Sequence, residues 1–302
     1  MPFRDVYRRQ AALLIRVLPH VAREKAFALK GGTAINLFIR NMPRLSVDID
    51  LTYLPVQERA ASLAAIEAAL RRIAASLKKD IGGQINEGVT EGRVTKLFAH
   101  VERVQVKIEV NPVIRGCVFQ VQTRDVKPLV EKTFGFVEMP LVSFPDLYAG
   151  KAVAGLDRQH PRDFFDWRDL LANEGITDEL RRTFLVYMVS HDRPMFEVLA
   201  APRKDLSERF AREFDGMTEE PVTIEQLAAA REALIAGIVG DMPDSHRAFL
   251  LSFERGQPDW KIIGIAHVAD LPAVKWRQVN LNKLAPAERA ALVDELEKVL
   301  SK

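Results

Sequence analysis

The segment from Leu45 to Leu54 constrains the fold more than any other part of the chain, because apolar and polar residues alternate along it. This alternation is typical of a β-strand, in which successive side chains point to opposite faces. Asp48 and Asp50 therefore share one face of the predicted strand, and Ile49 and Leu51 share the other. Two carboxylates on one face can hold one or two divalent cations through their oxygens. When such a pair stands alone, a solvated strand face is the more frequent explanation.

The tripeptide Gly31-Gly32-Thr33 lies between a predicted strand at 27–30 and a predicted helix at 34–40. Glycine allows a ligand to approach the backbone closely, and the free N–H groups and dipole of a helix N-terminus attract phosphate. The alternative is a plain turn between two elements. Because this turn and the Asp48/Asp50 strand flank one short helix, the two features together predict a triphosphate site beside a cation site.

Glu109 is the candidate for a third carboxylate, on a strand predicted at 105–112. Lys107 shares its face, so the alternative is an exposed Lys/Glu face on an edge strand. Three clustered carboxylates would repel one another without a cation, which favours a bound metal. Mg²⁺ is the expected ion, with Mn²⁺ as its substitute.

The order of predicted elements indicates an α+β fold in which helices flank a mixed sheet and the C-terminal region is mainly helical. We predict domains at 1–175 and 176–302. The other predicted strands span residues 84–89, 93–101 and 118–121. The other predicted helices span residues 4–22, 57–79, 179–189, 224–238, 245–253 and 286–300, and two more start near Ser143 and Pro161.

Composition excludes several classes of protein. The 302 residues include 43 basic and 41 acidic ones, so the net charge of +2 gives no strong global field for nucleic acid. The single cysteine, Cys117, excludes an internal disulfide and a Cys-rich zinc site. No stretch approaches the roughly 18 apolar residues of a membrane span, and no signal peptide is visible. We therefore expect a cytoplasmic protein without a membrane partner.

Three motifs together resemble the AbiEii (DUF1814) nucleotidyltransferases, a family within the DNA polymerase β-like superfamily that is related to the MenT toxins. The first runs from Gly31-Gly32-Thr33 to Arg-x-Ser-x-Asp-Ile-Asp-Leu at 44–51, and the second is Val-Lys-Ile-Glu-Val-Asn at 106–111. The third is helical and contains Lys151, Arg158 and Arg-Asp-x-x-Asp at 162–166. The likeness covers about residues 25–170. One departure is Thr33, where the superfamily often has serine; threonine keeps the hydroxyl.

The resemblance implies a role for each matching residue. Asp48, Asp50 and Glu109 would hold catalytic Mg²⁺, and any of them could serve as the base. Triphosphate would be contacted by Gly31, Gly32, Thr33, Ser46 and Lys151. Asp163 and Asp166, three residues apart on one helix face, would complete the catalytic set with Lys151. The alternatives are a surface ion-pair network for this helix and a solvated lysine at 151.

The implied function is Mg²⁺-dependent transfer of a nucleoside monophosphate from an NTP to an RNA acceptor, with tRNA as the expected RNA. The family suggests the toxin of a type IV toxin–antitoxin or phage-defence system, partnered by an AbiEi-type antitoxin that is encoded nearby. Candidate RNA-binding residues are Arg8, Arg9, Arg71, Arg72, Lys78, Lys79, Arg158 and Arg162. One alternative is a catalytically inactive nucleotide-binding or interaction module of the same fold. Another is a phosphate-ester hydrolase that uses the same metals.

Overall fold

A computed structural model describes residues 3–301, which form two compact units. The first unit contains the described residues up to Ser143 together with Asp215–Pro221, and the second contains Phe144–Phe214 and the chain from Val222 on. The domain boundary at 175/176 stays a prediction. Within residues 3–301 we find no helix whose length and hydropathy would let it span a lipid bilayer.

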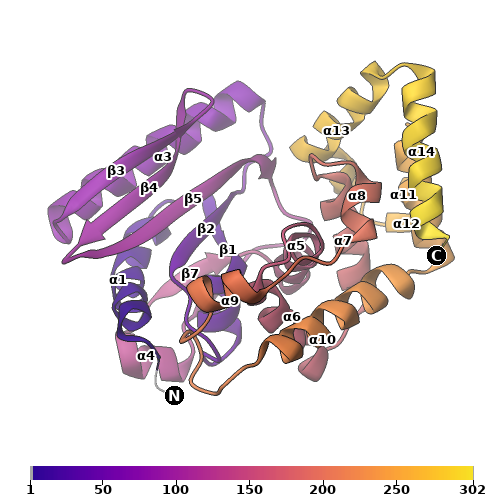
Figure 1. The fold of residues 1–302 in the computed structure, drawn as a ribbon. Coiled ribbons are helices and arrows are strands. Elements are labelled where there is room, and N and C mark those ends of the chain that lie inside the picture. Colours follow the sequence, from indigo (N-terminus) through magenta and orange to yellow (C-terminus); the bar gives the residue numbers. More distant parts are fainter. Residues whose placement is uncertain (1–2, 302) are drawn as a thin grey trace. The chain divides into compact units, whose positions relative to one another are not determined.

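The first unit is built on a mixed sheet, which has seven strands in the described part of the chain (Figure 1). The strand order is β3-β4-β5-β2-β1-β7-β6. The strands are β1 (Phe27–Lys30), β2 (Asp48–Tyr53), β3 (Gln84–Thr90), β4 (Arg93–Val101), β5 (Val104–Arg115), β6 (Gln122–Asp125) and β7 (Glu138–Leu141). The central strand β2 pairs antiparallel with β1 and parallel with β5.

One face of this sheet is apolar and is covered by helices. Helix α1 (Asp5–Ala22) packs against β5 and β7, and α3 (Arg59–Asp80) packs along β4 and β3. Ile49, Leu51 and Ile108 of β2 and β5 are fully buried and belong to this face. Because side chains alternate along a strand, Asp48, Asp50, Lys107 and Glu109 lie on the opposite face. The remaining helical elements are α2 (Gly31–Thr33), a π-helical turn η1 (Ala34–Ile39) and α4 (Pro128–Phe134).

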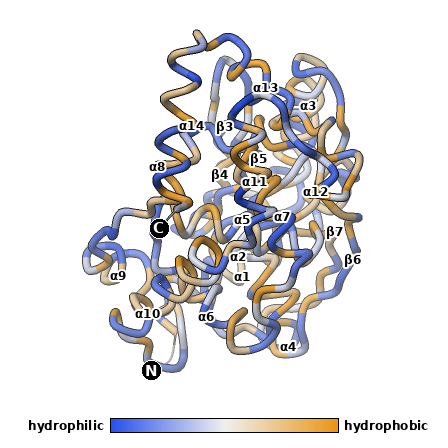
Figure 2. The backbone as a smooth tube through the Cα atoms, turned by 90° about the vertical axis from the view of Figure 1, so that its right-hand side faces the viewer, coloured by the Kyte–Doolittle hydropathy of each residue, from blue (hydrophilic) through white to orange (hydrophobic). Residues whose placement is uncertain are grey.

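In the second unit, every secondary-structure element of the described residues is a helix. Its elements are α5 (Phe144–Asp157), α6 (Pro161–Asn173), α7 (Asp178–Val189), α8 (Met195–Ala200), α9 (Ser207–Glu213), α10 (Ile224–Ile235), η2 (Ala236–Gly240), α11 (Asp244–Glu254), α12 (Trp260–Ile263), η3 (Ala266–Asp270), α13 (Pro272–Lys283) and α14 (Pro286–Leu300). Helix α5 packs against α6 and α7, and α10 packs against α6. Along α14, hydrophobic stretches recur between hydrophilic ones, which is typical of a helix with one buried face (Figure 2).

The expected α+β architecture and the helical C-terminal region are confirmed. One expected strand, at 118–121, is wrong: Val118 is buried but outside any strand, and pairing begins only at Gln122. The helix expected over 34–40 forms as the wider π-helical turn η1, which directly follows the glycine turn.

Candidate functional site

The backbone of Gly31 lies close to the side-chain carboxylate of Asp50. Gly31 has φ +72°, a left-handed conformation that glycine adopts without strain. A Cβ added to Gly31 would lie 2.8 Å from Oδ2 of Asp50, so a larger residue would collide with that carboxylate. The pairing of β1 with β2 sets this approach, because Lys30 stands opposite Asp50. Position 31 therefore needs glycine both for its φ and for the space beside Asp50.

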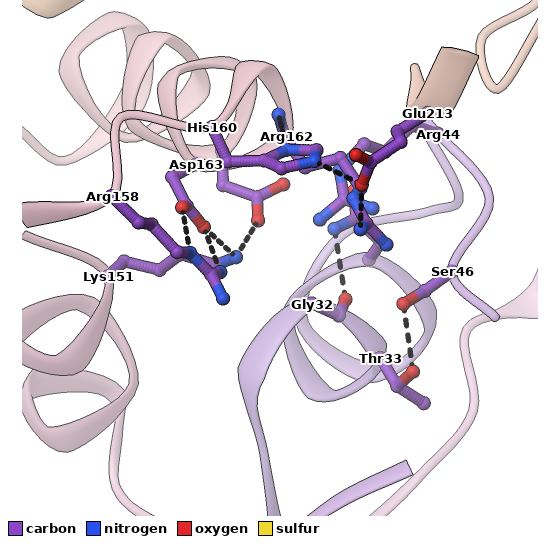
Figure 3. Close-up of polar contacts among 12 residues, drawn as sticks. Gly32, Thr33, Arg44, Ser46, Lys151, Arg158, His160, Arg162, Asp163 and Glu213 are labelled. Atoms are coloured by element: carbon purple, nitrogen blue, oxygen red, sulfur yellow. Dashed lines mark hydrogen bonds and ion pairs between the residues drawn. The ribbon is translucent and has the colours of Figure 1, made fainter. Parts of the chain in front are cut away.

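Two hydroxyls fasten the turn to the strand that carries the carboxylates. The Thr33 hydroxyl donates a hydrogen bond to the carbonyl oxygen of Asp48, and its oxygen lies 2.9 Å from the Ser46 hydroxyl (Figure 3). Thr33 and Ser46 are both buried. In this structure the two hydroxyls hold the turn against β2, and a contact of either with triphosphate stays a prediction.

A buried arginine lies behind the same turn. A Cβ built on Gly32 would lie 2.6 Å from an Nη atom of Arg44 and 3.2 Å from the Ser46 hydroxyl. Arg44 is only 1% exposed, and its guanidinium donates a 2.9 Å hydrogen bond to the carbonyl oxygen of Leu45. Arg44 is the arginine of the Arg-x-Ser-x-Asp motif at 44–48, but the sequence alone assigns it no role, since a single arginine gives no signal of burial.

Asp48 and Asp50 occupy the polar face of β2, as the alternation predicts. Opposite them on β5 stand Lys107, in register with Asp48, and Glu109, in register with Asp50. Burial raises the pKa of Asp50, and the nearby charges of Asp48 and Glu109 raise it further. Lys30 and Lys107 oppose this shift. The net effect is a carboxylate that is harder to ionise than usual, which a bound cation would reverse.

Glu109 lies beside Asp50 but is already engaged by two lysines. Its Oε1 is 2.9 Å from Nζ of Lys96 and its Oε2 is 2.7 Å from Nζ of Lys107. Burial would raise the pKa of Glu109, but hydrogen bonds from Lys107 and Lys96 outweigh that effect and lower it. The edge-strand alternative is wrong, because β5 lies between β2 and β4 inside the sheet. Lys96, on the partner strand, was missed because register across a hairpin cannot be read from one segment.

The donor set fits a divalent cation held by two carboxylates. Among residues 3–301, no group of three or more His, Cys, Asp or Glu side chains is arranged to hold a metal ion. Asp48 and Asp50 remain a pair of oxygen donors on one face, and Asp50 has a raised pKa. Mg²⁺ typically binds one or two carboxylates and completes its shell with water and substrate phosphate. The fit is therefore to Mg²⁺ or Mn²⁺ on this pair, and Glu109 as a third ligand stays a prediction.

The other predicted catalytic residues form a buried ion cluster within the second unit. Nζ of Lys151 lies 2.9 Å from both Asp163 and Asp166 (Figure 3 shows Lys151 and Asp163). Arg158 adds a forked contact to Asp163, at 2.7 and 2.8 Å. Lys151, Asp163 and Asp166 are all buried, so neither a solvated lysine nor a surface network describes them.

Opposite charges stabilise this cluster internally. Burial alone would raise the pKa of Asp163, but Lys151 and Arg158 hold that pKa far below its usual range. Asp163 and Asp166 share one face of α6 because they are three residues apart, and Lys151 reaches them from α5. The arrangement fixes the ammonium of Lys151 in one position.

His160 caps the same helix. Its Nδ1 accepts a hydrogen bond from the backbone N–H of Arg162, and its Nε2 lies 2.8 Å from Glu213, the last residue of α9. Burial and, to a lesser extent, the charge of Arg162 lower the pKa of His160 to about 4, although Glu213 and Asp163 oppose the shift. At neutral pH the ring is therefore neutral and donates to Glu213 from Nε2. The residue is 6% exposed, so it is buried at the start of α6 and does not lie on the surface.

Comparison with known proteins adds two findings. Residues 12–277 match the AbiEii family, described as a nucleotidyl transferase AbiEii toxin of a type IV toxin–antitoxin system. Among solved structures, the chain resembles MenT4, a nucleotidyltransferase toxin from Mycobacterium tuberculosis H37Rv, with a TM-score of 0.58 and 15% sequence identity. The likeness covers 91% of this chain and 93% of that one, and it confirms the expected fold. Comparison with curated protein sequences gives no match.

Proposed function

The chain belongs to the AbiEii nucleotidyltransferase toxin family, and on that premise we propose that it transfers a nucleoside monophosphate from an NTP to an RNA. We propose tRNA as the acceptor and Mg²⁺ as the ion. The observation that carries the proposal is the juxtaposition of the Gly31 turn with Asp50 on a strand that also presents Asp48. A phosphate-binding turn and a pair of metal-binding carboxylates are the two parts that phosphoryl transfer requires.

The reaction is a displacement at the α-phosphorus. The hydroxyl oxygen of the acceptor forms the new bond to phosphorus while the bond from that phosphorus to the bridging oxygen of pyrophosphate breaks. The acceptor's proton passes to a carboxylate of the site, and pyrophosphate leaves with the electrons of the broken bond. Bound Mg²⁺ would neutralise charge that develops on the phosphates and lower the pKa of the attacking hydroxyl.

The chain's own residues supply positioning. Asp48 and Asp50 would hold the ion, and the backbone N–H groups of Gly31–Thr33 would bind phosphate oxygens. Thr33 and Ser46 keep the turn at a fixed place on β2 through their mutual contact. Lys151, Asp163 and Asp166 stay proposed members of the catalytic set, supported by the fixed position of the Lys151 ammonium.

An RNA acceptor needs basic surface beside the site. Lys78 and Lys79 are exposed in the last turn of α3, whereas Arg71 and Arg72 form ion pairs with Glu67 and Glu24. The two lysines are therefore the less engaged basic residues of this helix, but α3 covers the sheet face opposite Asp48 and Asp50, so they would contact RNA away from the carboxylates. We further propose that the protein acts in the cytoplasm as the toxin of a type IV toxin–antitoxin or phage-defence system, with an AbiEi-type antitoxin encoded nearby.

A labelled-nucleotide assay tests the proposal. Wild-type protein is incubated with total RNA, Mg²⁺ and each of the four NTPs labelled at the α-phosphate, and both RNA label and pyrophosphate are measured. We expect RNA of tRNA size to become labelled with release of pyrophosphate. Asp48→Asn should lose this activity by about 10³-fold, roughly 4 kcal/mol of transition-state stabilisation. Asp125→Asn is the matched control, because Asp125 is exposed on β6 of the same unit.

Three outcomes contradict the proposal. Transfer by Asp48→Asn at the wild-type rate would show that Asp48 does not hold the catalytic ion. Nucleotide binding without pyrophosphate release would indicate a catalytically inactive binding module. Loss of nucleotide without labelled RNA would indicate a hydrolase.

A further inference from the structure

A segment from late in the sequence is built into the first unit. Asp215–Pro221, which lies between α9 and α10 along the chain, belongs to the unit that contains the sheet. The N–H of Leu45 donates a 2.8 Å hydrogen bond to the carbonyl oxygen of Met217, and Arg44 and Thr218 form an antiparallel bridge. Met217 is 1% exposed. The segment thus pairs with the two residues that precede Ser46, and we call it the strap.

The strap is anchored at its other end to the start of the chain. The N–H of Arg4 donates a 2.9 Å hydrogen bond to the carbonyl oxygen of Gly216, and the Arg4 side chain pairs with Asp215. Gly216 has φ +82°, and a Cβ added there would lie 2.3 Å from Cγ of Arg4. Only glycine satisfies both the left-handed backbone and the contact with Arg4 at this position.

Arg44 connects the strap to the predicted phosphate-binding turn. Its backbone forms the bridge to Thr218, and its guanidinium occupies the space that a side chain at Gly32 would fill (Figure 3). An arginine keeps its charge at all accessible pH values, and its planar group holds a fixed orientation. A buried positive charge behind a turn strengthens the attraction of that turn for anions.

We propose that Arg44 is a positioning residue for the triphosphate-binding turn, and that the strap Asp215–Pro221 holds Arg44 in place. This inference rests on the proposed function, because it assumes that Gly31–Thr33 binds triphosphate. It adds a residue role and a segment that neither the sequence motifs nor the comparisons assign to the site.

Binding of inorganic triphosphate tests Arg44 apart from catalysis. Calorimetric titration with Mg²⁺ and tripolyphosphate compares wild type, Arg44→Met, Arg44→Lys and the exposed control Arg124→Met on β6. We expect affinity to fall about 10- to 100-fold in Arg44→Met, the range found when a residue that orients a ligand is removed. Arg44→Lys should recover part of the loss through its charge, and Arg124→Met should match wild type.

Two further readouts separate positioning from general destabilisation. Hydrogen exchange measured by mass spectrometry should show faster exchange at the amides of 31–34 in Arg44→Met, while β4 and β5 stay protected. For NTP transfer, KM should rise about tenfold and kcat should change less, as expected for lost ground-state binding.

Gly216→Val tests the strap, with Gly92→Val as its matched control. Gly92 also has positive φ, but nothing lies within 4 Å of a Cβ added there, so the substitution adds strain without displacing a contact. We expect Gly216→Val to raise exchange at 31–34 and to weaken tripolyphosphate binding, and Gly92→Val to do neither. Gly216→Val also keeps the inference testable if Arg44→Met fails to fold.

Unchanged tripolyphosphate affinity in both Arg44→Lys and Gly216→Val would overturn the inference. So would equal acceleration of exchange across the whole sheet. If the wild type does not label RNA but its binding of tripolyphosphate still depends on Arg44, the proposed function is refuted and the inference on Arg44 stands.

Discussion

The polar face of β2 and the ion cluster between α5 and α6 both contain carboxylates that are at least partly removed from water, but the pKa of Asp50 and that of Asp163 are shifted in opposite directions. On β2, the like charges of Asp48 and Asp50 share one face, and the pKa of Asp50 is raised by burial and by Asp48. In the helical cluster, Lys151 lies between two carboxylates, and the pKa of Asp163 is strongly lowered. In the first group, carboxylates of like charge share one face and Lys30 and Lys107 only partly offset the shift of Asp50, whereas in the second group opposite charges are in direct contact.

Carboxylates that adjoin like charges and carboxylates that contact opposite charges contribute differently to binding and to stability. A site for a cation must keep carboxylates that repel one another until the ligand arrives, so its residues weaken the fold. A buried pair of opposite charges depends on its partners, and removal of one partner leaves an uncompensated charge. Substitutions on β2 should therefore affect mainly ligand binding, and substitutions in the helical cluster should affect stability in addition to the catalytic role proposed for it.

The largest expected effect on stability is that of Asp163→Asn. The change removes one of the two carboxylates that contact the buried Lys151 and a carboxylate that Arg158 contacts, so we expect the free energy of unfolding to fall by about 3–5 kcal/mol. Chemical denaturation monitored by circular dichroism measures it. Asp192→Asn is the control, because the Asp192 side chain is 89% exposed. A loss below about 1 kcal/mol, the value of a surface ion pair, would contradict the claim that the ion pairs of Asp163 stabilise the second unit.

Acid should weaken the second unit through His160. The folded pKa of His160 is about 4, below the ordinary value of 6.5, so the unfolded chain binds the proton first as the pH falls. Stability is thus fully present above pH 6.5 and declines as the pH falls toward 4, with a slope of up to about 1.4 kcal/mol per pH unit. Urea unfolding at several pH values measures this slope.

His160→Asn sharpens the acid test, since asparagine can still cap α6 but does not titrate. We expect a shallower loss of stability between pH 6.5 and 4 in this variant than in wild type. Identical slopes in the two proteins would show that groups other than His160 carry the acid sensitivity in this pH range.

The smallest expected effect is that of Glu109→Gln. Both carboxylate oxygens of Glu109 are paired with lysines, and these pairs are about one-third exposed, so stability should change by less than about 1 kcal/mol. Nucleotide transfer should fall by about tenfold or less, which is 1.4 kcal/mol. A loss as large as that of Asp48→Asn would instead show that the ion replaces the lysine contacts of Glu109, as its predicted role as third ligand requires, and would extend the carboxylate site to β5.

The sequence predicted those elements whose signal is local. The strands at 27–30 and 93–101 and the helix at 286–300 have the bounds expected for them. Strand β6 was not predicted because its four residues are all exposed and show no alternation. Strand β7 was not predicted because it contains Pro140, a residue that is rare inside strands. In both cases pairing with a neighbour, rather than local pattern, creates the strand.

The same distinction holds for the candidate site. Spacing alone placed Asp48 and Asp50 on one face and identified the turn at Gly31. The close approach of buried Arg44 to Gly32, the contact of Glu109 with Lys96 and the bond from Leu45 to Met217 all join segments that are distant in sequence or lie on different strands. Such contacts depend on register and chain crossing, for which a single sequence carries no direct signal.

Manganese-dependent stabilisation tests most directly whether the β2 face is a ligand site. The free energy of unfolding is measured for wild type and Asp50→Asn, each with and without Mn²⁺. A ligand present at 100 times its Kd stabilises the folded state by about 2.7 kcal/mol, so wild type should gain stability and Asp50→Asn should gain almost none. Without Mn²⁺, the variant should be at least as stable as wild type, because it lacks one of two repelling charges. An equal gain with Mn²⁺ in both proteins would contradict the account.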